Sequence, residues 1–232
     1  MTYDEGVIKF SAQHRKVELS HRRFGEVASR LVAWRGILLQ TGLVGQDPNR
    51  YGGAGYGNVS ARVGAPSSSR GERPFLVSGT QTGGLECVNM DDFALVRRYS
   101  IVQNSVESEG LIQPSSEAMT HGAIYDLGSH IRFVYHGHCP VIWKQAKPMG
   151  IPVTDPGIPY GTPEMAREMA RLYQESTLPQ TRVLAMGGHE DGIIVFGKTP
   201  DEAGALMVQT LATAYTRICS EGGGQLCVTG PG

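Results

Sequence analysis

The chain has 232 residues, and its 21 Lys and Arg against 22 Asp and Glu give a formal net charge of −1. Charged residues make up 19% and hydrophobic residues 40%, which excludes a disordered, highly charged chain. The charge balance also argues against nucleic acid as the main partner, because that binding needs a concentrated basic surface. Glycine is unusually frequent, with 31 residues, which indicates tight turns or backbone held close to a ligand.

Hydrophobic residues at helical spacing predict a first long helix over residues 15–42, followed by a glycine-dense loop over 44–56. Beyond this loop, short apolar runs predict strands, and capping residues followed by apolar stripes predict helices. In chain order we expect strands at 58–63, 75–77, 92–99 and 101–106, a helix at 115–127 with Ser115 as its N-cap, a strand at 131–136, a helix at 162–175, strands at 181–186 and 192–196, and a last helix at 199–220.

The predicted strands fall in pairs rather than alternating strictly with helices, which indicates an α/β fold with a mixed or antiparallel central sheet. Without an internal repeat or a linker, we expect one domain over residues 1–232, whose glycine-rich end, 221–232, forms a flexible tail. There is no signal-peptide pattern, no run approaching the ~20 apolar residues of a membrane span, and no paired arrangement of the cysteines. We therefore expect a cytoplasmic protein with reduced thiols and no membrane partner.

Three histidines form the clearest candidate site. His136 and His138 close an apolar strand, and side chains two residues apart on a strand point to the same face. His189 follows the end of another apolar strand. Three imidazoles with an open fourth position are typical of a catalytic zinc site. The alternative is that all three are ordinary hydrogen-bonded histidines at strand ends.

The segment Ser115-Ser116-Glu117 is a second candidate, because it stands where a helix is expected to begin. Exposed N–H groups and two hydroxyls suit an anion there, and Glu117 is suited to act as an acid or base. The alternative is an ordinary helix cap with a favourably placed carboxylate. His121, one helical turn later, is more typical of a supporting or core histidine than of a ligand.

Two turns add candidate anion-binding groups. Asn58 follows a glycine, and the pair Ser78-Gly79 closes a short strand, so each places a small polar residue beside glycine at a strand terminus. Such turns expose backbone N–H groups to an anion, although each alone is also simply a turn. The glycine loop before Asn58 lacks both the P-loop and the dinucleotide-binding spacing, so nucleotide binding is not indicated.

These motifs follow one another in a set order. They are Gly57-Asn58-Val59-Ser60-Ala61-Arg62, then Val77-Ser78-Gly79, then Pro114-Ser115-Ser116-Glu117 with His121, then His136-Gly137-His138, and finally His189. From about residue 25 to about residue 215, this order resembles that of the class II aldolase/adducin family. The resemblance implies a single three-layer α/β/α domain and a homotetramer with active sites at the subunit interfaces.

The resemblance also implies roles for single residues. His136, His138 and His189 would bind Zn²⁺ or another divalent ion such as Mn²⁺, Co²⁺ or Fe²⁺, and Glu117 would be the acid/base. A substrate phosphate would be held by Asn58, Ser78, Gly79, Ser115 and Ser116. The implied activity is a metal-dependent lyase that cleaves or forms a C–C bond in a small phosphorylated ketose through a metal-stabilised enediolate. A sugar-phosphate 4-epimerase or dehydratase with the same metal site, and a non-catalytic adducin-like interaction domain, are the alternatives.

Two departures from the family pattern bear on the chemistry. Residues 139–154 contain no tyrosine, whereas the fuculose phosphate aldolases carry a catalytic tyrosine in a longer segment there. Tyr160 is a candidate substitute, but its surroundings favour a surface turn. Glu190 and Asp191 directly follow His189 and are expected to form a solvated turn rather than to orient that histidine.

Overall fold

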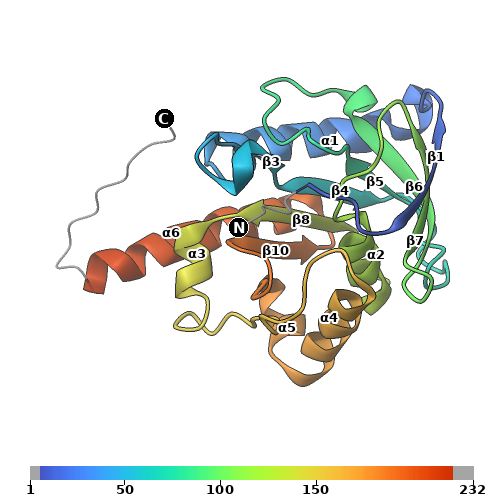
Figure 1. Ribbon diagram of the computed structural model, residues 1–232. Coiled ribbons are helices and arrows are strands. Elements are labelled where there is room, and N and C mark those ends of the chain that lie inside the picture. Colours follow the sequence, from blue (N-terminus) through green and yellow to red (C-terminus); the bar gives the residue numbers. More distant parts are fainter. Residues whose placement is uncertain (1–5, 222–232) are drawn as a thin grey trace.

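An eight-stranded mixed sheet runs through the middle of the molecule in the computed structural model, which describes residues 6–221 (Figure 1). Its strands are β1 Ser11–Lys16, β4 Asn58–Arg62, β5 Phe75–Ser78, β6 Phe93–Ser100, β7 Ser105–Gly110, β8 Phe133–His138, β9 Val183–Ala185 and β10 Gly192–Gly197. The order across the sheet is β1-β7-β6-β5-β4-β8-β10-β9, and β1 pairs with β7 in parallel while the other neighbours pair antiparallel. A separate two-stranded hairpin joins β2 Gly45–Gln46 to β3 Gly55–Tyr56.

Helices cover both faces of this sheet. They are α1 His21–Gln40, α2 Ala118–Leu127, α3 Pro140–Gln145, α4 Pro163–Glu175, α5 Leu178–Thr181 and α6 Pro200–Glu221, with single 3₁₀ turns η1 Tyr51–Gly53 and η2 Met90–Asp92. Side chains of α1, α3 and α6 share one hydrophobic cluster with the sheet, and those of α2, α4 and α5 share the other. This three-layer α/β/α arrangement with a mixed sheet confirms the predicted fold class.

The alternation of side chains along β8 places two of the candidate histidines. Val134 packs into the cluster of α2 and α4, and Tyr135 packs into the cluster of α1 and α6. Because successive strand residues face opposite sides, His136 and His138 share the side of Val134. Gly137 lies between them on the other side, where a Cβ atom would approach the main-chain oxygen of Leu43 to 2.7 Å. This strand therefore needs glycine at position 137 to pack.

Three predicted elements near the N-terminal half are wrong in their bounds. The first helix begins at His21, because Arg15 and Lys16 belong to β1, whose parallel pairing with β7 no local pattern reveals. The strand predicted over 101–106 lies later, since residues 101–104 form a turn that ends in a left-handed Asn104 with φ 46°. The loop predicted over 44–56 contains the β2–β3 hairpin and η1.

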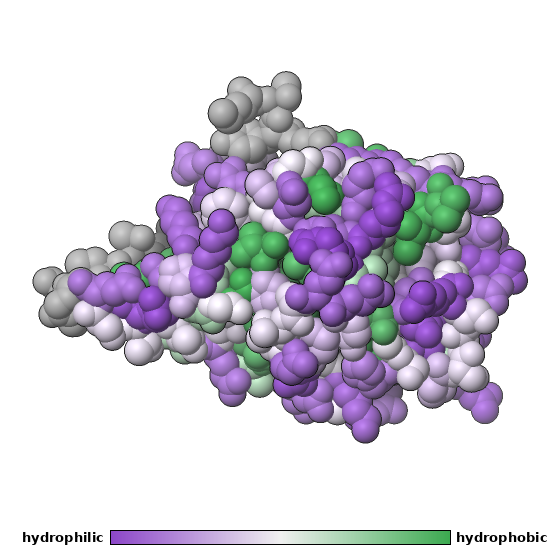
Figure 2. Space-filling view, turned by 90° about the horizontal axis from the view of Figure 1, so that it is seen from below, coloured by the Kyte–Doolittle hydropathy of each residue, from purple (hydrophilic) through white to green (hydrophobic). Residues whose placement is uncertain are grey.

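The C-terminal half follows the prediction more closely, apart from two short helices, α3 and α5, that were not predicted. The last helix includes Glu221, the first residue of the predicted tail, and the rest of that tail lies outside the described residues. Among residues 6–221, each helix is too short or too polar to cross a membrane. The surface seen from below is mostly hydrophilic, with hydrophobic residues in small separate groups (Figure 2).

Candidate metal centre and active site

Three imidazoles meet at one end of the sheet. β8 supplies His136 and His138, and β10 pairs beside it so that Gly192 lies opposite His138. The turn before β10 then brings His189 to the same place. The Nε2 atom of His138 lies 3.0 Å from Nε2 of His136 and 3.0 Å from Nε2 of His189. The structure therefore brings the three predicted histidines together.

Burial keeps these histidines neutral near pH 7. It lowers the pKa of His136 to about 4, against the opposing effect of a hydrogen bond to the Ile193 carbonyl. Burial, followed by the neighbouring imidazoles, holds the pKa of His138 and of His189 well below the usual range. His136 Nδ1 donates to the Ile193 oxygen at 3.1 Å, so its Nε2 carries a lone pair.

The contacts among the three nitrogens suit a cation. A neutral imidazole carries one N–H, so His138 Nε2 can donate to one neighbouring nitrogen but not properly to both. A metal ion accepts all three lone pairs at once. Two nitrogens bound to one tetrahedral zinc at about 2.0–2.1 Å lie roughly 3.3 Å apart, close to the separations seen between these Nε2 atoms. His136, His138 and His189 thus form a possible three-histidine metal site.

Glu117 faces the same point from the start of α2. Its Oε2 lies 3.7 Å from Nε2 of His136, its Oε1 lies 3.6 Å from Nε2 of His189, and the residue is only 1% exposed. The prediction of Ser115 as N-cap is wrong, because α2 begins at Ala118. Ser115 Oγ instead accepts a hydrogen bond from the Glu117 N–H at 3.2 Å, so the turn before α2 fixes the acid in place.

Four of the five predicted phosphate-binding residues line one small pocket; they are Asn58, Gly79, Ser115 and Ser116. Gly6, Gly55, Gly57 and the turn 80–83 complete its wall, and its volume is about 10 Å³, enough for roughly one water molecule. Ser78 does not belong to this lining, because its Oγ accepts the Val59 N–H at 3.1 Å. Asn58 Oδ1 is buried there without a hydrogen-bond partner among the described residues.

Tyr51 and Arg50, which the sequence analysis did not single out, support the histidines together with Asp191. The ring of Tyr51 packs edge-on against His138, with ring centroids 4.6 Å apart. Tyr51 Oη donates to Asp191 Oδ2 at 2.7 Å, and Arg50 lies 3.5 Å from the same carboxylate. The expected solvated turn is wrong for Asp191, which is 7% exposed. For Arg50 and Tyr51, the only sequence signal was the presence of two large polar side chains in a glycine-dense loop.

Tyr160 also lies at the site, so its prediction as a surface residue is wrong. It is 4% exposed, and its ring centroid lies 4.4 Å from that of His189. Lys9 packs its ammonium 3.8 Å from the centre of the Tyr160 ring, and Tyr160 Oη donates to the Val7 carbonyl at 3.4 Å. The segment before β1 therefore covers this tyrosine, which a local turn pattern cannot show.

Comparison with known proteins places this geometry in a family. The class II aldolase and adducin N-terminal domain matches residues 48–218, so the chain belongs to the class II aldolase/adducin family, as its motifs indicated. No curated protein sequence gave a significant match. The match to the family, together with the three-histidine group, supports an enzyme of class II aldolase type.

Solved structures from this family share the fold at low sequence identity. An l-fuculose-1-phosphate aldolase from Thermus thermophilus aligns at 18% identity and a TM-score of 0.60, covering 88% of this chain and 100% of its own. A sugar-phosphate aldolase from Thermotoga maritima aligns at 19% identity and a TM-score of 0.59, covering 88% and 98%. YgbL from Klebsiella pneumoniae, a proposed aldolase/epimerase/decarboxylase, aligns at 17% identity and a TM-score of 0.60, covering 87% and 92%.

Proposed function

We propose that this protein is a cytoplasmic, metal-dependent lyase that cleaves or forms a C–C bond in a small phosphorylated ketose. The observation that carries the proposal is the convergence of three buried Nε2 atoms with a buried carboxylate within 3.7 Å of two of them. Membership of the class II aldolase/adducin family supports this activity, and so do solved structures whose names specify sugar-phosphate aldolases.

In this proposal His136, His138 and His189 hold a divalent ion, which is Zn²⁺ or another such ion, for example Mn²⁺, Co²⁺ or Fe²⁺. When bound, the ion supplies a Lewis acid that stabilises the negative charge of an enediolate. Glu117 carries the proton to and from the substrate, because its carboxylate faces the same point as the imidazoles. Its burial excludes water that would compete for that proton.

The substrate phosphate is assigned to the pocket beside Glu117. Asn58, Gly79, Ser115 and Ser116 supply the lining, and Ser78 holds the neighbouring strand through Val59. A phosphate group needs several times the present volume of about 10 Å³, so the proposal requires the wall formed by Gly6 and the turn 80–83 to move outward. Phosphate binding away from the reacting carbon would orient the substrate and contribute binding energy to the reaction.

A 4-epimerase or a dehydratase would use the same metal and phosphate groups, so the products decide between these activities. The test is to incubate zinc-loaded protein with a panel of phosphorylated ketoses that includes l-fuculose 1-phosphate. A triose phosphate or another carbonyl fragment supports the lyase, an epimer supports the epimerase, and loss of water supports the dehydratase. The substitution Glu117→Gln is expected to lower turnover by about 10²–10⁴-fold with the metal retained.

Three results would overturn the proposal. Turnover of the unphosphorylated ketoses alone would remove the phosphate assignment of Ser115 and Ser116. Full activity of Glu117→Gln would remove the acid/base role. A protein that holds far less than one metal per chain after zinc loading would favour the non-catalytic, adducin-like alternative.

Assembly into a homotetramer with active sites between subunits belongs to the same proposal. Light scattering of the purified protein should give four times the 25.0 kDa mass of one chain. A monomer that is active at nanomolar concentration would exclude a site shared between subunits.

A further inference from the structure

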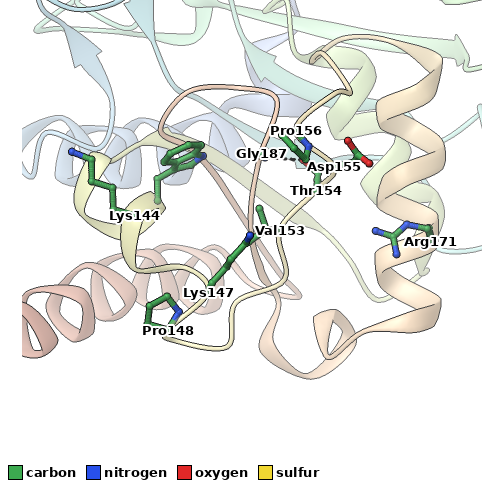
Figure 3. A pocket seen from close by; sticks show the side chains of 10 residues that line it. Lys144, Lys147, Pro148, Val153, Thr154, Asp155, Pro156, Arg171 and Gly187 are labelled. Atoms are coloured by element: carbon green, nitrogen blue, oxygen red, sulfur yellow. Dashed lines mark hydrogen bonds between the residues drawn. The ribbon is translucent and has the colours of Figure 1, made fainter.

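A second cavity lies beside Gly187, two residues before His189. It has a volume of about 660 Å³ and is formed by α3, the segment 153–156, α4 and Gly187 (Figure 3). This size falls within the range of roughly 300–1,000 Å³ that is usual for small-molecule sites. None of the predicted catalytic, metal or phosphate residues lines it. The cavity therefore has room for a ligand that the metal centre does not use.

Positive charge predominates in the lining. Lys144, Lys147 and Arg171 contribute three cations, against the single carboxylate of Asp155. Figure 3 shows Lys147 reaching into the pocket with Arg171 directed toward it from α4, while Lys144 lies on the outer side. Arg171 is paired with Glu168 at 2.7 Å, but neither lysine has an ion-pair partner among residues 6–221. The pocket thus offers unneutralised positive charge to an anion.

The rest of the lining is suited to an apolar body. An indole, two proline rings and a branched aliphatic side chain form it; they are Trp143, Pro148, Pro156 and Val153. The indole N–H of Trp143 is already used, because it donates to the Met186 carbonyl at 2.8 Å. A ligand in the pocket therefore meets the face or edge of that ring rather than a free donor.

The pocket is tied to the strand and turn that lead to His189. Besides the bond from Trp143, the Gly187 N–H donates to Thr154 Oγ1 at 2.9 Å, and the Thr154 N–H donates to the Ala185 carbonyl at 3.0 Å. The packing is close, since a Cβ atom on Gly187 would lie 2.3 Å from the Thr154 carbonyl oxygen. A ligand that shifts the segment 153–156 must therefore also shift the residues before His189.

We propose that this pocket binds a small organic anion, with a carboxylate or phosphate group on a compact apolar body, and that binding is coupled to the metal centre. Lys147 and Lys144 attract the anionic group, and the apolar wall holds the body. The binding half stands independently of the proposed lyase activity. The coupling half rests on metal binding by the three histidines, which belongs to the proposed function.

Tryptophan fluorescence tests the binding half directly. The chain has two tryptophans, and Trp34→Phe leaves Trp143 in the pocket wall as the only one. Phenyl phosphate is the probe, and benzoate distinguishes a carboxylate ligand from a phosphate ligand. We expect a saturable fluorescence change on binding. Lys147→Gln should lower the affinity for the probe about tenfold, the scale of one charge-assisted hydrogen bond, and Lys144→Gln should lower it less. The control Lys198→Gln removes an exposed lysine outside the pocket and should leave the affinity unchanged.

Two further probes, each lacking one part of phenyl phosphate, test whether the pocket is an anion site. Benzyl alcohol has the ring without the charge, and inorganic phosphate has the charge without the ring, so both should bind more weakly than phenyl phosphate. Equal affinity for benzyl alcohol, or no effect of Lys147→Gln, would exclude an anion site here. Loss of the signal in Glu117→Gln would show that the probe occupies the metal-centre region instead.

Zinc affinity tests the coupling half without any turnover measurement. Chelator competition is run with and without saturating phenyl phosphate, and linkage requires the two ligands to affect each other reciprocally. We expect zinc affinity to change by about fivefold or more, and the change to require about tenfold more phenyl phosphate in Lys147→Gln. Contacts between zinc and phenyl phosphate in solution would instead affect both proteins equally. Equal zinc affinities with and without the probe would overturn the coupling.

Discussion

Two buried polar groups lie next to each other on the α2 side of the sheet. In the first, Ser60 Oγ lies 2.6 Å from Nδ1 of His121 and 2.7 Å from Oη of Tyr125. In the second, the three imidazoles of β8 and the turn before β10 converge on one point. The groups are neighbours because β4 pairs with β8, where Ser60 lies opposite Val134 and His136 lies two residues further along.

Burial does not distinguish the two groups, but hydrogen bonding does. Burial lowers the pKa of His121 to about 3 and that of His136 to about 4, so both imidazoles are neutral at pH 7. A hydroxyl donates one proton and accepts others, so Ser60 can serve both of its partners. Three imidazole nitrogens have no such complement among themselves. The first group is therefore a hydrogen-bonded network centred on Ser60, in which His121 Nε2 is buried without a partner among the described residues, and the second group is arranged for a cation.

Removing one imidazole of the three-histidine group is the most severe test of the difference between this group and the network around Ser60. In His138→Ala the central nitrogen of the metal group is lost, so we expect metal content after zinc loading to fall from about one per chain to below a tenth. Elemental analysis of the dialysed protein measures this. Turnover in the ketose screen should be lost with the metal.

His121→Gln is the matched control, because it changes a buried histidine of the neighbouring network. It should keep its metal while losing stability. Equal metal loss in both variants would mean that the two groups form one structural unit, and the distinction drawn between them would be wrong.

Removing the hydroxyl of Ser60 should lower the stability of the protein and leave its metal content unchanged. Ser60→Ala leaves Nδ1 of His121 and Oη of Tyr125 without their shared partner in a buried position. An unsatisfied buried polar group costs about 1–3 kcal/mol, so we expect urea denaturation to show a loss of unfolding free energy of that size. Metal content should stay at its wild-type level. Unchanged stability with reduced metal content would contradict the structural role.

The sequence was sufficient to predict what depends on local geometry. The pairing of His136 with His138 follows from the two-residue repeat of a strand, so their common face needed no tertiary information. The order of elements indicated an α/β fold with a mixed or antiparallel sheet, and the resemblance to the class II aldolase/adducin family implied its three layers. Glu117 was identified although the cap assignment of Ser115 was wrong, because a shift of three residues in the helix start still leaves the acid at its beginning.

What depended on distant packing was not predictable in the same way. Asp191 looked like a solvated acid, but its partner Tyr51 comes from a loop 140 residues away. Tyr160 looked like a surface residue because the segment that covers it, around Val7 and Lys9, precedes β1. In each case the neighbour that buries the side chain is remote in sequence, so no local pattern contains it.

Acid titration should reveal the contribution of His121, in the network around Ser60, to the stability of the protein. The folded pKa of His121, about 3, lies below its value of roughly 6.5 in the unfolded chain, so the unfolded state takes up a proton first. Its contribution to stability is complete above about pH 6.5 and is lost as pH falls, by about 1.4 kcal/mol per pH unit. Urea denaturation of wild type and His121→Gln between pH 6 and 4.5, with zinc held saturating, should show the shallower slope in the variant. If the stability of both proteins falls equally steeply with pH, a group other than His121 takes up the proton on unfolding.

The smallest expected effect concerns a hydrogen bond outside the metal site, between Thr154 and Gly187. Thr154 accepts the Gly187 N–H at 2.9 Å, and it lies beyond the groups that touch the histidines. Thr154→Val keeps the shape and removes the acceptor, so the turn before His189 should loosen and zinc affinity should fall by up to about tenfold, the low end for outer partners of metal ligands. Chelator competition measures this, and Thr210→Val, another buried threonine of the sheet's opposite side, is the control. If zinc affinity is unchanged in Thr154→Val, the metal group is held entirely by the strands and by Tyr51. The bond from Trp143 to the Met186 carbonyl and the main-chain bond from Thr154 to Ala185 would then remain as the hydrogen bonds that link the cavity to the strand and turn before His189.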